Sequence, residues 1–213
     1  IVERLKAKSH DGRMIPITLV RRKDIKLDGK SKMVLYAYGA YKHSVDVSFS
    51  ASRFCLIDRG ITFGIAHVRG GSELGNHWHE ESKFSKKINT FKDYISCSNY
   101  LIEQKYTYKG GISFLGGSAG GLTGSAVANM APELFFSMLL LVPFCDPLTT
   151  MLNEKLPLTP SEWELWGNPI KSKKYFESIL SYSPYNNLRR TSYPPMYVTS
   201  SLFDSRVLYS EVV

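Results

Sequence analysis

A serine in a glycine-rich turn, Gly116-Gly117-Ser118-Ala119-Gly120, constrains the fold of this chain more than any other feature of its sequence. The apolar segment 111–115 runs directly into the turn, and a segment of helical composition follows it as far as Met130. Glycines lack a Cβ, so they allow a strand and a helix to meet closely and a serine to occupy a sharp, strained turn. In this setting the pattern G-x-S-x-G predicts an elbow that lifts a nucleophilic serine clear of a parallel sheet.

A glycine-rich turn between a strand and a helix can also bind phosphate at the helix N-terminus. The glycine spacing here does not fit G-x-x-x-x-G-K-[ST], and no lysine follows. The elbow is therefore the better interpretation. The Ala119 amide then opens the predicted helix, where N–H groups can stabilise a developing oxyanion.

The rest of the chain alternates short apolar segments with segments of helical spacing. The predicted strands are 2–7, 14–21, 33–37, 62–68, 111–115, 136–144 and 195–200, and the predicted helices are 89–104, 119–130 and 173–181. We expect the strands after residue 33 to be buried, Thr90 and Asp93 to form a capping box, and 156–169 to be an irregular insertion. This alternation, together with the elbow, predicts an α/β-hydrolase fold with a mostly parallel sheet.

The acid of a hydrolytic triad should follow a strand later than the elbow, and the histidine should come last. Asp204 follows the predicted strand 195–200. A lone aspartate there is ordinarily a turn or helix cap, but its place one strand–helix–strand unit after Ser118 favours the triad acid. The five histidines, His10, His43, His67, His77 and His79, all precede Ser118. None is placed in the sequence to serve as the base, so we expect this chain alone to be inactive.

Charge and composition narrow the remaining function classes. The net charge of +8 is one property of nucleic-acid-binding proteins, but the cationic residues form small scattered groups without a binding motif. The apolar runs are far shorter than the roughly 20 residues that span a bilayer, and the first residues of the given sequence show no signal-peptide pattern. We therefore expect neither a nucleic-acid partner nor a membrane, and a cytoplasmic location.

The cysteines and histidines do not predict a metal or a cofactor. Cys55, Cys97 and Cys145 are odd in number and lack CxxC spacing, which favours buried free thiols in a reducing compartment. His77 and His79 stand beside two glutamates, but this pattern is weak and favours a surface position over a metal site.

Several segments together resemble the peptidase domain of the prolyl oligopeptidase family, most closely its oligopeptidase B branch. They are 35–39, 56–60, 65–71, 86–94, 116–121, 146–152, 166–169, 181–185 and 204–207. The resemblance implies that 1–213 is an incomplete α/β-hydrolase peptidase domain, without the family's N-terminal β-propeller and without its last strand and helix. It also implies cleavage of short peptides after Arg or Lys through an acyl-enzyme.

By resemblance, Ser118 is the nucleophile, Asp204 the triad acid, Tyr38 and the Ala119 amide the oxyanion donors, and Arg206 the ligand of a substrate carbonyl.

Glu162 and Glu164 match the acidic pair that holds a basic substrate side chain in the family, and two carboxylates suit a guanidinium or an ammonium. The alternative is a capping box that begins at Ser161. Asp46 matches one member of a second acidic pair, but Ser48 stands at its partner's position, which leaves selectivity for a second basic residue open.

Four hypotheses remain from the sequence. The first is a peptidase domain completed by a separate C-terminal segment that carries the histidine. The second is an inactive remnant of a split gene, and the third is a basic binding module. The fourth is a general esterase, against which the two glutamates favour a cationic substrate.

Overall fold

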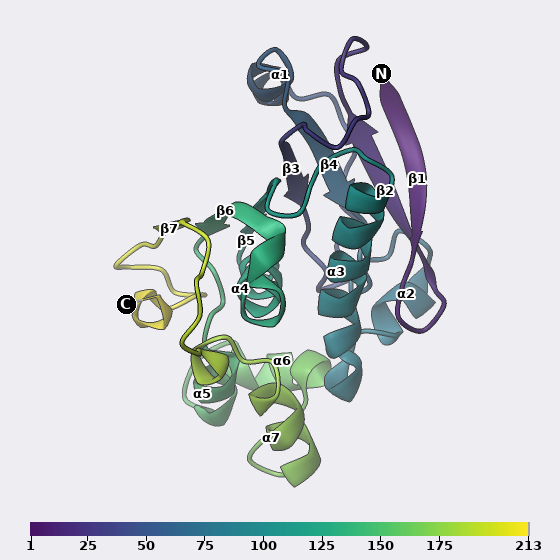
Figure 1. Ribbon diagram of the computed structural model, residues 1–213. Helices are drawn as coiled ribbons and strands as arrows, with labels where there is room; N and C mark the ends of the chain where they lie inside the picture. Colours follow the sequence, from purple (N-terminus) through teal and green to yellow (C-terminus); the bar gives the residue numbers. More distant parts are fainter. Residues whose placement is uncertain (213) are drawn as a thin grey trace.

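The computed structural model describes residues 1–212, and they fold around one sheet with the strand order β1-β2-β4-β3-β5-β6-β7 (Figure 1). The strands are β1 Val2–Lys8, β2 Met14–Val20, β3 Met33–Tyr36, β4 Thr62–Ala66, β5 Ile112–Gly117, β6 Phe135–Leu141 and β7 Met196–Thr199. The pairs from β4 to β7 are parallel, whereas β1 and β2 join the sheet antiparallel. The predicted α/β-hydrolase fold with a mostly parallel sheet is confirmed.

Helices cover both faces of the sheet. They are α1 Ala51–Ile57, α2 Asn76–Glu80, α3 Ile88–Glu103, α4 Ala119–Met130, α5 Pro147–Leu152, α6 Thr159–Trp166 and α7 Lys173–Leu180. In Figure 1, α3 and α4 lie side by side over one face, and α5, α6 and α7 gather at the end of the molecule opposite α1. Short turns of 3₁₀-helix lie at Phe84–Lys86, Pro132–Leu134, Tyr185–Asn187 and Tyr209–Glu211.

The core follows from the alternation of side chains along the central strands. Leu35 of β3 packs into the large cluster beneath α3 and α4, whereas its neighbour Val34 joins a smaller cluster on the opposite face. Both faces of β3 are therefore covered, which explains why its sequence is apolar without interruption. None of the helices in the part of the chain that the structure describes is long and apolar enough to cross a membrane.

The two ends of the sheet differ. Strand β1 carries four charged residues, Glu3, Arg4, Lys6 and Lys8, and charged side chains are typical of a protected edge. Strand β7 is apolar but exposed, with Tyr197 66% accessible, so the prediction of a buried strand at 195–200 is wrong. Its one partner among residues 1–212 is β6, and apolar composition does not by itself supply a second neighbour.

Two local predictions are also wrong. Thr90 and Asp93 lie inside α3, which has Lys87 at its N-cap, and no side-chain cap forms. Asp93 instead accepts hydrogen bonds from the Arg69 guanidinium at 2.7 and 2.8 Å, and Thr90 donates to the Arg69 carbonyl. Segment 156–169 contains α6 rather than an irregular insertion, because Pro160 lies in the first turn, where a helix tolerates proline.

The cysteines and the histidine pair also differ in part from expectation. All three cysteines are free, but Cys55 is exposed rather than buried. His77 is exposed, whereas His79 is buried, and its Nδ1 lies 3.2 Å from the Gly70 carbonyl. Burial lowers the pKa of His79, which favours the neutral ring. Within residues 1–212, no three His, Cys, Asp or Glu side chains are grouped to hold a metal ion.

Candidate active site

Ser118 occupies the turn between β5 and α4 with a φ of 54° and a ψ of −122°, a left-handed conformation that L-residues rarely adopt. A Cβ on Gly121 would lie 2.4 Å from the Pro143 Cα, and one on Gly120 would lie 2.7 Å from the Ala37 carbonyl oxygen. These glycines therefore let α4 approach the neighbouring backbone. The strand–turn–helix predicted from the motif is present, and the serine itself occupies the strained position of the turn.

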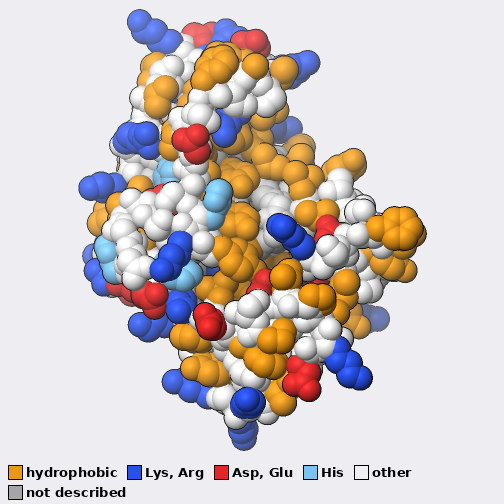
Figure 2. Space-filling model, turned by 180° about the vertical axis from the view of Figure 1, so that it is seen from behind, with side chains coloured by type: hydrophobic (Ala, Val, Ile, Leu, Met, Phe, Trp, Pro, Cys, Tyr) orange, Lys and Arg blue, Asp and Glu red, His pale blue; other side chains and the backbone are white. Residues whose placement is uncertain are grey.

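A cavity of about 950 Å³ opens in front of Ser118. Its walls come from the loop after β3, the start of α4, the segment around α5 and α6, and residues 205–208. On the face drawn in Figure 2, the molecule is hollowed between two lobes, and hydrophobic side chains form the floor of the hollow. Segments that are far apart in the sequence thus meet at the predicted nucleophile.

Tyr38 follows the end of β3 and lines the same cavity as Ser118. Burial raises the pKa of the Tyr38 phenol, and the nearby Ser118 hydroxyl opposes this rise. The phenol therefore remains protonated near neutral pH and can donate to an anion. The Thr123 hydroxyl of α4 donates to the Tyr38 carbonyl at 2.9 Å, which fixes the tyrosine backbone beside the elbow.

Ala119, the first residue of α4, also lines the cavity. Its N–H belongs to the first turn, where backbone amides have no partner within the helix. The structure thus brings together Ser118, Tyr38 and Ala119, the three residues to which the sequence assigned nucleophilic and oxyanion roles. This arrangement can stabilise negative charge beside the serine oxygen.

Of the two glutamates on α6, only Glu162 faces this cavity. Its Oε2 accepts hydrogen bonds from the Trp166 indole at 2.7 Å and from the Tyr41 hydroxyl at 3.1 Å. Burial, followed by the negative charge of Glu162, raises the pKa of the Tyr41 phenol. Glu164 is exposed and lies outside the cavity, because residues two apart on a helix point in different directions.

The capping box that begins at Ser161 is wrong, since α6 has Leu158 at its N-cap and Ser161 donates to the Leu158 carbonyl. Asp46, like Glu164, is exposed and does not line the cavity.

Asp204 caps the turn that follows β7. Its Oδ1 accepts the N–H groups of Arg206 at 2.8 Å and Val207 at 3.0 Å, and these bonds lower the pKa of the Asp204 carboxyl. Its Oδ2 accepts no hydrogen bond from any residue between 1 and 212. Arg206 lines the cavity, whereas Asp204 does not. The structure therefore shows the turn-capping role and leaves one carboxylate oxygen available.

Two cavity residues, His43 and Tyr41, and the fully buried Trp166 have roles that the sequence analysis did not predict. His43 lines the cavity and packs edge-on against Tyr38, with ring centroids 5.0 Å apart, although no hydrogen bond joins His43 to Ser118 in the described part of the chain. Tyr41 and Trp166 hold Glu162. Tyr41 and Lys42 both have a φ of 58°, so the loop that carries His43 is strained. No local motif indicates such a placement.

Comparison with known proteins agrees with the family resemblance seen in the sequence. Residues 47–213 match a family described as the prolyl oligopeptidase family. The chain is 48% identical over 212 residues to dipeptidyl aminopeptidase BI of Pseudoxanthomonas mexicana, and the match covers 99% of this chain and 29% of that protein. It is 44% identical to protease 2 of Moraxella lacunata, with 98% of this chain and 30% of that protein covered.

Among solved structures, oligopeptidase B from Leishmania major matches with a TM-score of 0.96 and 44% identity, over 99% of this chain and 29% of that chain. The chain thus spans less than a third of the length of each of these relatives.

Proposed function

The chain belongs to the prolyl oligopeptidase family, and on that premise we propose that residues 1–213 form the catalytic part of a serine endopeptidase of the oligopeptidase B type, which cleaves short peptides after Arg or Lys. The observation that carries the proposal is that Tyr38 and Ser118 line one cavity that also holds Glu162. All described strands join one sheet, which supports assigning 1–213 to the peptidase domain and the family's β-propeller to a separate domain.

The proposed chemistry begins at Ser118. Its oxygen attacks the substrate carbonyl and forms an acyl-enzyme as the amine leaves, and water then hydrolyses the ester. The Tyr38 hydroxyl and the Ala119 amide would bind the oxyanion of each tetrahedral intermediate. The loop 205–208 brings Arg206 to the same cavity, where its guanidinium can hold a substrate carbonyl.

Glu162 would select the substrate. Its carboxylate lies in the cavity and is oriented by the Trp166 and Tyr41 donors, so it offers a fixed negative charge to an Arg or Lys side chain. A general esterase would have no use for that charge. The exposed positions of Glu164 and Asp46 leave Glu162 as the acidic determinant that we assign within the described cavity.

The proton acceptor would come from a histidine on a segment outside residues 1–213. Two observations support this partner. The Oδ2 of Asp204 is available to orient an imidazole, and β7 exposes apolar side chains along the edge of the sheet nearest Asp204. Such a segment would cover that edge and complete the order Ser118, Asp204, histidine.

Mixing the chain with a histidine-bearing C-terminal segment of a relative tests the proposal. We expect cleavage of a short arginyl peptide that neither piece cleaves alone. Glu162→Gln should lower kcat/KM for this peptide by about 10-fold to 100-fold, because a charge-assisted hydrogen bond is lost. The matched control Glu164→Gln should stay within about twofold. A stable complex without turnover would contradict the peptidase function and favour an inactive remnant.

A further inference from the structure

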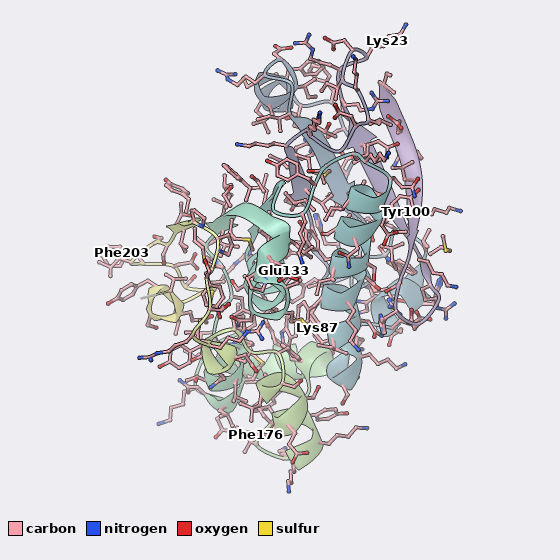
Figure 3. The ribbon with its side chains drawn as sticks, viewed as in Figure 1. Lys23, Lys87, Tyr100, Glu133, Phe176 and Phe203 are labelled. Carbon is pink, nitrogen blue, oxygen red and sulfur yellow. The ribbon has the colours of Figure 1, made fainter. Side chains whose placement is uncertain are left out.

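Lys87 is a buried lysine for which the proposed chemistry has no role. Its side chain is 1% exposed at the start of α3. Figure 3 shows it inside the molecule, at the end of α3 that approaches α6. Burying an ammonium is unfavourable unless neighbouring groups compensate it, so the contacts of Lys87 must account for its burial.

The Nζ of Lys87 donates hydrogen bonds to the Gly39 carbonyl and, at 3.2 Å, to the Thr90 hydroxyl. Gly39 directly follows Tyr38 and has a φ of 81°. A Cβ on Gly39 would lie 2.4 Å from the Thr90 Cγ2, so this turn rests tightly on α3. Lys87 therefore fixes the Gly39–Ala40 peptide in the turn after Tyr38, the tyrosine that lines the cavity with Ser118.

The charge of Lys87 is not matched by a bonded carboxylate. Asp93 acts on it over a distance, but both oxygens of Asp93 are already bonded, to Arg69 and Ser9. Its other neighbours are aromatic faces, with the Trp166 ring centroid 5.1 Å from Nζ. Burial lowers the pKa of Lys87 to about 7, and Asp93 opposes that shift. A positive charge without its own counter-ion thus lies beneath the Tyr38 turn.

We propose that Lys87 is a positioning residue for the oxyanion, which holds the Gly39 carbonyl in the turn after Tyr38 and favours negative charge at Ser118 through its own positive charge. The inference rests on the proposed function, because it assumes that an oxyanion forms at Ser118. A buried cation oriented before the reaction stabilises such an anion more than a solvated one does.

The effect of the Lys87 charge on an oxyanion should depend on pH in a definite direction. The elements around Lys87 also carry other charged groups, and of these Asp93 on α3 stabilises the charged form of Lys87. The others are Lys92 and Glu103 on α3, Glu162 and Glu164 on α6, Arg69 after β4, and Lys83 and Lys86 before α3. With a pKa of about 7, Lys87 carries its charge below that pH and loses it above. Its support for an anion is therefore largest in acid and declines as the pH rises through 7.

Phenylboronate and 4-aminobenzamidine separate this role from a structural one. The boronate bonds to the serine oxygen, the serine proton leaves to water, and the boron becomes a tetrahedral anion. The amidinium instead tests the cavity around Glu162. We expect Lys87→Met to weaken phenylboronate binding at pH 6.5 by about tenfold. The affinity for 4-aminobenzamidine should stay within about twofold or rise, because a buried cation is removed.

The exposed neighbour provides the matched control, since Lys86→Met should change neither affinity. Lys87→Gln keeps a hydrogen-bond donor for Gly39 without the charge, so it should restore part of the boronate affinity. The ratio of the unmodified chain's boronate affinity to that of Lys87→Met should shrink between pH 6 and 8.5. Equal losses for both ligands, or no loss for either, would overturn the inference, whereas an unmodified chain that binds no boronate would contradict the oxyanion site itself.

Discussion

Two walls of the cavity are built in different ways. The nucleophile wall consists of Tyr38, Ser118 and Ala119, carried by β3, β5 and α4 in the middle of the sheet. The acid wall consists of 205–208, directly after Asp204, and this segment follows the exposed edge strand β7. The first wall holds a strained serine because buried elements surround it, whereas the second follows a strand that has one neighbour among residues 1–212. The core can thus hold the catalytic turn in place even where the neighbouring acidic segment depends on an exposed strand.

Truncating one aromatic side chain in the strand that leads to each wall should give the largest difference between the two walls. Phe114 of β5 is fully buried and packs against the Tyr94 ring at 5.1 Å, whereas Tyr197 of β7 is largely exposed. Phe114→Ala should lower the free energy of unfolding by about 3–5 kcal/mol, since it leaves a cavity. Tyr197→Ala should change it by about 0.5 kcal/mol or less. Urea unfolding followed by circular dichroism measures both.

Phe114→Leu provides a milder variant if Phe114→Ala does not fold. Similar losses at the two positions would mean that β7 is packed as firmly as β5, and the contrast between the walls would then be wrong.

The attachment of the acid wall should depend on pH. Glu211 lies just after 204–208, is 9% exposed and accepts hydrogen bonds from the Thr150 hydroxyl at 2.8 Å and the Asp146 N–H at 3.2 Å. Burial raises the pKa of Glu211 from 4.5 to about 7, and the charge of Asp146 adds to the rise, while the hydrogen bonds oppose it. The neutral carboxyl is therefore the form that the folded chain favours.

Because the folded pKa exceeds the unfolded one, the stabilisation from Glu211 is complete below pH 4.5 and is lost as the pH rises through 7. The loss should reach at most about 3 kcal/mol. Glu211→Gln should remove this decline. Between pH 4.5 and 8, urea unfolding should therefore show a smaller fall in the free energy of unfolding for the variant than for the unmodified chain. The exposed Glu164→Gln should follow the unmodified chain, and an equal slope in the Glu211 variant would exclude this attachment.

The elbow of the nucleophile wall could be predicted from the sequence because the residues that form it, a turn and the strand before it, are adjacent in the chain. The glycines around Ser118 are needed wherever a strand meets a helix this closely, and the apolar strands beside it are short and uninterrupted. The acid wall was harder to predict. The apolar residues of β7 indicate a preference for burial, but they do not say which segment covers them.

Other features depend on partners far away in the sequence. Asp93 matched a capping pattern, yet its actual partner is Arg69, 24 residues earlier. His43 reaches the cavity through the turn at Tyr41 and Lys42, whose positive φ angles leave no mark in composition. Pro160 suggested an irregular segment, although the same residue is compatible with the first turn of α6 and thus with the position of Glu162.

The smallest expected effect concerns the backbone strain at Ser118. It tests whether the buried elements around the nucleophile wall impose the strained conformation of this serine. With a φ of 54°, the serine Cβ opposes the conformation that the surrounding backbone imposes. Ser118→Gly should therefore raise the free energy of unfolding by about 1 kcal/mol, as far as the greater freedom of glycine in the unfolded chain allows. Ser118→Ala retains the Cβ and should show no gain, and both variants should lose phenylboronate binding. A gain in Ser118→Ala equal to that in Ser118→Gly would instead trace the instability to the buried hydroxyl rather than to the backbone. The expected pattern would mean that the core maintains a strained serine for its reactivity, at some loss of stability.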